Sequence, residues 1–411
     1  MNRRLTTIAA ACLVLVLLVF ASLALAADAD VTPPTTVDNY DGLWHNATVT
    51  VLLTATDDSS GVAGTYYSFD GSTWLAGTSF EIAATADHLA DGEHVASYKS
   101  VDNAGNWETP KSCTVKIDTQ LPTASITGND ALWHRQPVLL TLGGDDVGPA
   151  GLLGLQYKID GRSWTSGTTA TVKAPTTHSW DGTHKVYYRS RDNAGNLSAS
   201  PAPYVTVKID TKGPACSAPY AASGVRYGYA TLKYRVNDAR SSRADVTIKI
   251  KTLSGSTIKT LGLGSKYTNK LLSTKVQCTW APKDYRFYVY ANDLAGNKQS
   301  KVGVNTLTVK PQVLSGLSAS VSDSTPAQYS DVTVKCRAKD QAGRSIKGVK
   351  CTFVWHYKTT TPKETRSTGS DGIARCTRNI SGATAGYRVV VTITATYGGV
   401  TKTTSTSFVP H

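Results

Sequence analysis

The chain carries the pentapeptide Asp-Asn-Ala-Gly-Asn at 102–106 and again at 192–196, 90 residues later. Four more segments recur at nearly the same spacing: 43–45 with 132–134, 70–74 with 160–164, 91–92 with 181–182, and 115–119 with 207–211. Repetition in one order at one spacing predicts two tandem domains of about 90 residues. Arrays of small domains typically provide length, adhesion or display, so a catalytic site is not the first expectation.

Alternation of apolar and polar residues predicts strands along the rest of the chain. Val246–Lys251 and Val389–Ala395 place an apolar residue at every second position, which puts one face of a strand in a core. Turn pairs such as Asp91-Gly92 and Ser254-Gly255 recur about every 8–12 residues between such runs. The predicted fold class is all-β: a tandem array of four Ig-like antiparallel β-sandwich domains after an N-terminal signal peptide.

The N-terminal segment has the pattern of a secretion signal. Arg3 and Arg4 precede the wholly apolar Leu13–Phe20, and Ala24-Leu25-Ala26 has the small-x-small pattern of a cleavage site. We expect cleavage near Ala26; the alternative is a retained membrane anchor. No later stretch approaches the length of a membrane span, so none is expected after cleavage. The expected location is extracellular, with possible attachment to the cell surface.

Domain boundaries are predicted at short Asp-Thr-x-x-Pro segments, which occur at 118–122 and 210–214. Proline fixes φ and removes a backbone donor, so these joints are stiff. The predicted division is a signal peptide (1–26), two Ig-like repeats (27–118 and 119–212), a third Ig-like domain (213–310) and a fourth (311–411).

Charge is distributed unevenly along the chain. Residues 1–212 hold 14 Lys and Arg against 21 Asp and Glu, whereas residues 213–411 hold 29 against 9. A basic C-terminal half suggests affinity for polyanions. For an exported protein we expect cell-envelope polymers or surface glycans, and other surface proteins as further partners, but no nucleic acid. Lysines that only solubilise outward strand faces are the alternative.

The repeated segments resemble the bacterial Ig-like repeats of large secreted and surface proteins, some of which carry an outer-membrane label. The resemblance rests on 57–62 and 67–74, on the Asp-x-Ala-Gly-Asn turns and on the Ile-Asp-Thr joints. The third domain is similar to the Ig-like domain of flagellar hook-capping proteins, through 246–261 and 287–293. The fourth is similar to invasin/intimin-type domains, through 332–340, 348–353 and 371–374. These resemblances imply a fold; such modules serve as stalks, adhesins and enzyme appendages.

Two kinds of ligand site are candidates in the repeats. Calcium needs six to eight oxygens, and Asp57, Asp58, Asp102 and the joint residue Asp118 are weak candidates to supply them. The alternative is that the Asp-x-Ala-Gly-Asn segment is only a structural turn. Glycans stack on exposed aromatic rings, which makes these residues candidates if they share an exposed face: Trp74, Trp164, Tyr66, Tyr67 and Tyr157. Packing in the core is the alternative for each ring.

Six cysteines follow the signal segment, and in an exported protein we expect disulfides rather than metal ligands. Cys216 and Cys278 fall within one predicted domain and are expected to pair. The last domain holds Cys336, Cys351 and Cys376, of which two are expected to pair. Cys113 has no partner within its own repeat.

No catalytic motif occurs in the sequence: it lacks a Gly-x-Ser-x-Gly elbow, a His-Glu-x-x-His pair and a phosphate-binding loop. We therefore expect a protein that is not an enzyme and needs no cofactor. The leading hypothesis is a structural spacer or adhesive module whose basic half docks to anionic envelope polymers. The alternative hypothesis is a carbohydrate-binding protein that uses the Trp and Tyr side chains of the repeats.

Overall fold

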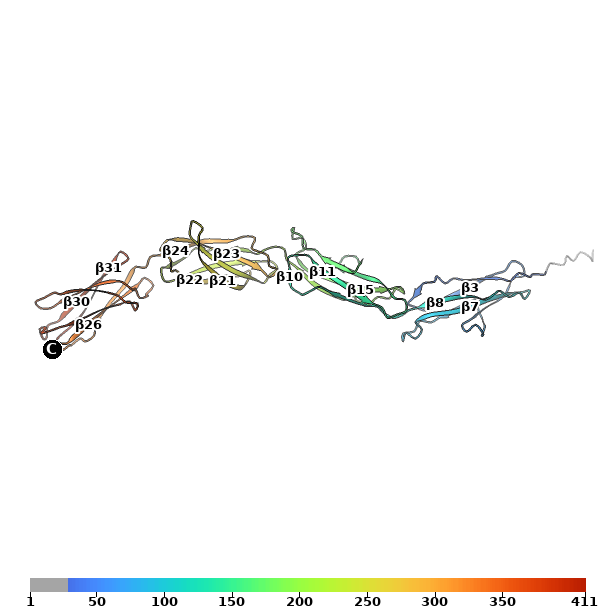
Figure 1. Ribbon diagram of the computed structural model, residues 1–411, viewed down its shortest axis with the longest axis horizontal. Coiled ribbons are helices and arrows are strands. Elements are labelled where there is room, and N and C mark those ends of the chain that lie inside the picture. Colours follow the sequence, from blue (N-terminus) through green and yellow to red (C-terminus); the bar gives the residue numbers. More distant parts are fainter. Residues whose placement is uncertain (1–28) are drawn as a thin grey trace, which may run out of the picture. The chain divides into compact units, whose positions relative to one another are not determined.

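The computed structural model describes residues 29–411, which form strands and turns without a helix (Figure 1). Accordingly, no helix that could cross a membrane is found in these residues. The predicted signal peptide lies outside the described residues. The all-β prediction is confirmed: the described strands form eight sheets, and their sequence alternation places every second side chain in a core.

In the first sandwich, a three-stranded sheet packs against a five-stranded sheet. Their strand orders are β1-β3-β6 and β2-β8-β7-β4-β5. The bounds are β1 Thr35–Asp38, β2 Trp44–His45, β3 Val49–Thr56, β4 Val62–Ser68, β5 Leu75–Ala76, β6 Ser79–Ile82, β7 Gly92–Asp102 and β8 Lys111–Ile117. Val51 and Phe80 of one sheet pack with Ala96 and Val115 of the other. The buried rows are the apolar positions of the alternating sequence, and burial of these rows stabilises the sandwich.

The first edge of this sandwich is split between the two sheets. β1 pairs antiparallel with β3, and β2 then pairs parallel with β8 in the opposite sheet. The recurring Trp44-His45 forms β2, and the backbone N–H of Asp118 donates to the carbonyl of His45 at 2.9 Å. The conspicuous Leu-Trp-His segment therefore marks the point where the chain changes sheets.

The second sandwich repeats this topology, with sheets β14-β11-β9 and β10-β16-β15-β12-β13. The bounds are β9 Thr123–Thr127, β10 Trp133–His134, β11 Val138–Asp145, β12 Leu152–Ile159, β13 Thr165–Ser166, β14 Thr169–Val172, β15 Gly182–Asp192 and β16 Tyr204–Ile209. β10 pairs parallel with β16, as β2 does with β8. The two segments that repeat in the sequence thus fold with the same pairing of strands.

The third sandwich keeps the same order in sheets β17-β19-β22 and β18-β24-β23-β20-β21. The bounds are β17 Ala215–Ser217, β18 Ala222–Val225, β19 Tyr229–Asn237, β20 Arg243–Lys251, β21 Thr257–Tyr267, β22 Leu271–Gln277, β23 Asp284–Asp293 and β24 Gly303–Lys310. Leu232 and Tyr234 of one sheet pack with Ile248 and Phe287 of the other.

The fourth sandwich differs, since its sheets have three and four strands, β25-β26-β29 and β28-β27-β30-β31. The bounds are β25 Leu314–Val321, β26 Asp331–Asp340, β27 Lys350–His356, β28 Lys363–Ser367, β29 Ile373–Asn379, β30 Val389–Tyr397 and β31 Val400–Phe408. Its core includes Phe353, Trp355 and Phe408, which are almost completely buried.

The chain divides into two compact units. Of the described residues, one unit holds those from 29 to 131 with Pro137–Lys173 and Thr183–Val207. The other holds Leu132–Gln136, Ala174–Gly182 and Lys208–His411. This division runs through the second sandwich. The four domain ranges drawn from the sequence therefore stay a prediction.

The predicted disulfides are contradicted: all six described cysteines are buried free thiols. Cys216 lies opposite Val236 near one end of β19, whereas the backbone N–H of Cys278 donates to the carbonyl of Gly228, just before the other end. Eight residues of extended strand separate these positions, on the order of 25 Å. A disulfide needs Cα atoms about 4.4–6.8 Å apart. The predicted disulfide between Cys216 and Cys278 is therefore wrong, because the two residues lie too far apart to be joined.

The cysteines of the fourth sandwich also remain thiols. Cys336 of β26 lies opposite Ala374, while Cys376 of β29 lies opposite Val334, so the two are diagonal neighbours within one sheet. Cys351 comes from β27 in the facing sheet, and its thiol donates to the backbone carbonyl of Val349 at 3.7 Å. The predicted disulfide between two of the three is not formed.

All six thiols are buried, so we expect none of them to react with a maleimide or iodoacetamide in the native chain at pH 8. Burial raises the pKa of Cys216 to about 11, and burial with the nearby Asp38 raises that of Cys113 to about 11. For these two side chains, only about one thiol in a thousand is then ionised to thiolate at pH 8. Peptide mapping should find all six labelled after denaturation without reductant. Labelling that requires a reductant would show that disulfides form.

Candidate functional site

Nine aspartates gather in three clusters, one in each of the first three sandwiches: Asp30, Asp57 and Asp102; Asp118, Asp146 and Asp192; Asp210, Asp238 and Asp293. Within each cluster, one oxygen of every carboxylate lies within 4.8 Å of the others. We call these the first, second and third acidic clusters. They occupy equivalent places in three repeats of one fold.

Three recurring elements build each cluster. The first aspartate precedes the first strand of the sandwich, as Asp118 precedes β9. The second aspartate lies just after the third strand of the sandwich, as Asp146 follows β11. The third is the last residue of a central strand, as Asp192 ends β15. The topology therefore brings together residues that are distant in sequence.

The last residue of each Asp-x-Ala-Gly-Asn turn ties the cluster together. The Asn196 amide donates to the Asp192 carboxylate at 2.7 Å and to the backbone carbonyl of Asp118 at 2.9 Å. Asn106 and Asn297 make the same two bonds in the first and third clusters. The repeated motif thus fixes the residue that opens each sandwich, which accounts for the recurrence of Asn at this position.

Each cluster combines at least one buried aspartate with at least one that is partly exposed. Asp118 and Asp192 have no exposed surface, and Asp210 is 1% exposed. Burial, followed by the charges of Asp238 and Asp293, raises the pKa of Asp210 to about 6. Burial raises the pKa of Asp118 as well, although backbone N–H groups oppose the shift. Like charges at this distance disfavour ionisation unless a cation offsets them.

The structure places the four predicted calcium candidates in different surroundings. Asp57 and Asp102 lie together in the first cluster, whose third member, Asp30, was not among the predicted candidates. Asp118 belongs instead to the second cluster, since it opens the second sandwich. Asp58 is exposed and belongs to none of the clusters found among the described residues. Asp30, Asp118 and Asp210 occupy equivalent positions before the first strand of each sandwich. This equivalence in the sequence could have identified the third member of each cluster.

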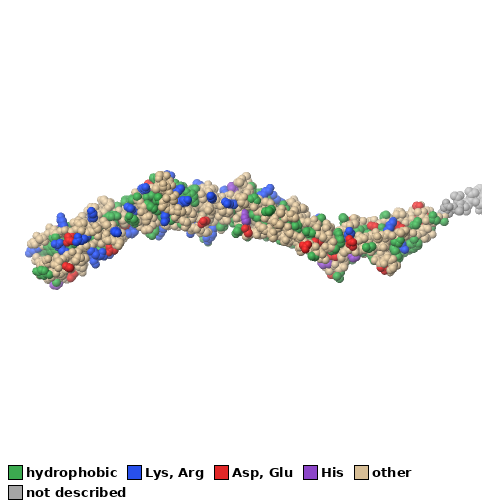
Figure 2. Space-filling view, in the orientation of Figure 1, with side chains coloured by type: hydrophobic (Ala, Val, Ile, Leu, Met, Phe, Trp, Pro, Cys, Tyr) green, Lys and Arg blue, Asp and Glu red, His purple; other side chains and the backbone are tan. Residues whose placement is uncertain are grey.

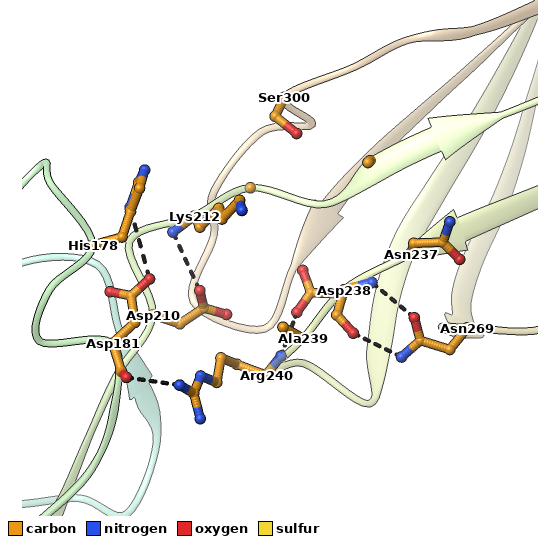
Figure 3. A pocket seen from close by; sticks show the side chains of 12 residues that line it. His178, Asp181, Asp210, Lys212, Asn237, Asp238, Ala239, Arg240, Asn269 and Ser300 are labelled. Atoms are coloured by element: carbon orange, nitrogen blue, oxygen red, sulfur yellow. Dashed lines mark hydrogen bonds and ion pairs between the residues drawn. The ribbon is translucent and has the colours of Figure 1, made fainter.

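A pocket of about 570 Å³ adjoins the third cluster. Figure 3 shows Asp210 and Asp238 at this pocket, with Lys212, Asp181 and Arg240 around it. The guanidinium of Arg240 donates to the backbone carbonyl of Asp181 at 2.9 Å, and among the described residues it forms no ion pair with the cluster. Two members of the third cluster, Asp210 and Asp238, thus line this pocket.

The predicted glycan-binding residues divide between two faces. Tyr66 and Trp74 lie with Lys99 on the outer face of the first sandwich, where the Lys99 ammonium sits 4.2 Å from the Trp74 ring centre. Trp107, which the sequence analysis did not select, joins them: its ring is 5.4 Å from Tyr66 and is 49% exposed. Tyr67 alternates to the inside, against Phe80, so its assignment to an exposed platform was wrong.

The second sandwich carries a related surface. Arg189 lies 4.0 Å and Lys158 5.0 Å from the centre of the Trp164 ring, and Lys158 also lies over Tyr187. Tyr157 precedes Lys158 on the same strand and therefore points to the opposite face. Hence Trp164 sits among cations, and Tyr157 does not share its surface.

Aromatic rings and cations also alternate on the outer face of the third sandwich. Tyr288 and Tyr290 of β23 stack with ring centres 6.5 Å apart. Lys251 lies 4.8 Å from the Tyr288 ring centre, and Lys249 lies 5.5 Å from that of Tyr290. Arg286 stands opposite Lys251 in the strand pairing. We call these five residues the basic aromatic face.

The cations of this face have no acidic partner: among residues 29–411, Lys249, Lys251 and Arg286 take part in no ion pair. Figure 2 shows Lys and Arg side chains spread over the third and fourth sandwiches, in agreement with the excess of 29 over 9 in residues 213–411. The charge of this half is thus presented outward on strands whose other faces form the cores.

Comparison with known proteins does not assign the chain to a family. No family model matches it. It is 27% identical over 333 residues to exoglucanase B of Cellulomonas fimi, a match that covers 78% of this chain and 29% of that protein. The chain thus spans less than a third of the length of this curated relative.

Three similar solved structures are repeat proteins. They are the D1–D4 ectodomain fragment of ICAM-5 (12% identity, 92% of this chain, 100% of that chain, TM-score 0.35), a tetra-tandem repeat in the extending region of a large adhesion protein (16%, 92%, 100%, 0.30) and fibronectin(III)-like modules of Clostridium thermocellum CbhA (14%, 43%, 94%, 0.31). The chain is a tandem Ig- or fibronectin-III-like β-sandwich protein on the evidence of its own sheets. Its assignment to a particular bacterial Ig-like family stays a prediction.

Proposed function

We propose that this chain is an exported, non-catalytic repeat protein that attaches to an anionic polymer of the cell surface and displays its remaining sandwiches. The single observation that carries the proposal is the basic aromatic face, where three cations without acidic partners surround two stacked tyrosines. Cations on a shared face raise the local concentration of a polyanion. Tyrosine rings between them add flat surfaces on which sugar rings can stack.

The test compares two charge-matched triple variants of the full chain. The first carries Lys249→Gln, Lys251→Gln and Arg286→Gln. The control carries Lys233→Gln, Arg235→Gln and Lys275→Gln, which remove the same charge from the opposite face of the same sandwich. Binding to immobilised polygalacturonate, a carboxylate polymer, is measured at low salt, with neutral dextran as the second surface.

We expect the first variant to lose at least ten-fold in affinity for polygalacturonate and the control to lose less than three-fold. Equal losses would mean that net charge, and not the basic aromatic face, determines binding. Undiminished binding by the first variant would refute attachment through this face.

Binding of a neutral polysaccharide is the second candidate function. The observation that favours it is the cluster of Tyr66, Trp74 and Trp107 in the first sandwich, of which Trp107 is 49% exposed. The name of the 27% identical relative, an exoglucanase, keeps polysaccharides among the ligands to test. Dextran or cellulose binding that survives high salt and is lost on Trp107→Ala would favour this function over polyanion attachment.

A further inference from the structure

In the described part of the chain, no Lys or Arg pairs with the three acidic clusters, whereas the fourth sandwich supplies an arginine at the equivalent turn. Asp340 ends β26 and starts the same turn as Asp102, with Arg344 in the place of Asn106. The Arg344 guanidinium lies 2.7 Å from the Asp340 carboxylate, whose side chain has no exposed surface. Among the described residues, none of the nine clustered aspartates forms an ion pair with Lys or Arg.

Two clusters also hold carboxylate oxygens without any partner. Asp57 Oδ1 and Asp146 Oδ2 have essentially no exposed surface and accept no hydrogen bond. The other oxygen of Asp57 accepts backbone N–H groups of Ser59 and Gly61 and so holds the carboxylate in place. A buried polar oxygen without a partner costs free energy, and an ionised one costs more. Such an atom within a carboxylate cluster is suited to a cation.

We propose that each of the three acidic clusters binds one calcium ion. Calcium takes oxygen ligands at about 2.3–2.6 Å in flexible geometry. Two oxygens on opposite sides of such an ion lie about 4.6–5.2 Å apart. The chosen oxygens of each cluster all lie within 4.8 Å of one another, close enough for one ion to contact all three carboxylates. Magnesium requires shorter bonds and near-ideal octahedral geometry, so it is expected to bind more weakly.

The ion would fasten the start of each sandwich to that sandwich. Asp30, Asp118 and Asp210 precede the first strand, whereas the other two ligands of each cluster come from the body of the fold. Asparagine side chains already hold these residues by their backbone carbonyls. Calcium would add a charge-neutralising link at the same point, so its removal should loosen the first strand before it affects the cores.

The experiment titrates CaCl₂ into the chelator-treated full chain by isothermal calorimetry and follows thermal unfolding in Ca²⁺ and in EDTA. We expect three ions per chain and a transition raised by about 5 °C or more in millimolar Ca²⁺, because a ligand that binds only the folded state stabilises it. Equal concentrations of MgCl₂ should give a smaller shift. No binding at millimolar Ca²⁺ would overturn the proposal.

Single substitutions distinguish ligands from merely structural acids. Asp146→Asn and Asp57→Asn should each lower the stoichiometry from three to two, while Asp58→Asn, next to Asp57 but outside the cluster, should leave it at three. In EDTA, Asp146→Asn should unfold at the same temperature as the unaltered chain or higher, since it removes a like charge. If Asp58→Asn lowers the stoichiometry as Asp57→Asn does, or if Asp146→Asn leaves three ions bound, the cluster assignment is wrong.

Discussion

Replacement of Trp355 by alanine is expected to destabilise the fourth sandwich by about 3–5 kcal/mol, the range for large aromatic side chains removed from a core. The Trp355 side chain is completely buried. Its ring stacks on Tyr357 with centres 6.4 Å apart and meets Phe408 edge-on at 6.0 Å. Hydrogen exchange followed by mass spectrometry should show protection lost in peptides that cover β27 and β30.

The control for this variant is Tyr387→Ala, which removes a ring that is 37% exposed from the same sandwich. We expect it to change the free energy of unfolding by less than about 1 kcal/mol. Peptides of the first sandwich should keep their exchange rates in both variants. Unchanged protection of β27 and β30 in Trp355→Ala would contradict the assigned core.

Replacement of Arg344 by alanine is expected to have the second-largest effect, about 2–4 kcal/mol at pH 7. Removing one partner of a buried ion pair leaves an uncompensated charge. The Asp340 side chain has no exposed surface, but the Arg344 side chain is 32% exposed, which places the effect below that of a fully buried pair. Exchange protection of peptides in β25 and β26 is the readout.

This effect should depend on pH in a defined direction. Burial raises the pKa of Asp340, but bonds from the Arg344 side chain and backbone and from Gln312 outweigh burial and hold the pKa below its usual value. A depressed folded pKa contributes stability above the unfolded pKa of about 3.9, and this stability is lost as pH falls through the folded value. The difference between Arg344→Ala and the unaltered chain should therefore shrink in acid.

The matched control is Arg375→Ala, because Arg375 and Asp371 form an ion pair of the same sequence spacing at 2.6 Å. Both of these side chains are about half exposed, and exposed pairs contribute only about 0–1 kcal/mol. A penalty for Arg375→Ala as large as that for Arg344→Ala would show that burial is not the cause.

The sequence predicted the sandwiches better than it predicted their joins. Alternation in Val246–Lys251 corresponds to buried Val246, Ile248 and Ile250, because period two is a local property of a strand. The change of sheets at Trp44-His45 could not be read, since it depends on a parallel pairing with β8 more than 70 residues away. The expected disulfides failed for the same reason: cysteine parity carries no information on distance.

The acidic clusters were predicted only in part. Asp57 and Asp102 belong to motifs that the sequence analysis used, whereas Asp30 precedes the first strand outside those motifs. Two members of the third cluster, Asp238 and Asp293, lie in the basic half of the chain, where few acids suggest an acidic site. On the aromatic surface, strand alternation alone separates Tyr66 from Tyr67, and the prediction grouped them because both adjoin the same turn.

The most direct test of surface attachment is the affinity of the full chain for polygalacturonate between 20 and 500 mM NaCl, with the basic aromatic face intact and with its three cations replaced. Salt screens exposed charges over about 10 Å at 0.1 M and less at higher concentration. The account predicts that the intact chain loses most of its affinity over this range and that the altered chain binds weakly throughout. Tight binding at 500 mM NaCl, or equal affinity of the two chains at low salt, would contradict it.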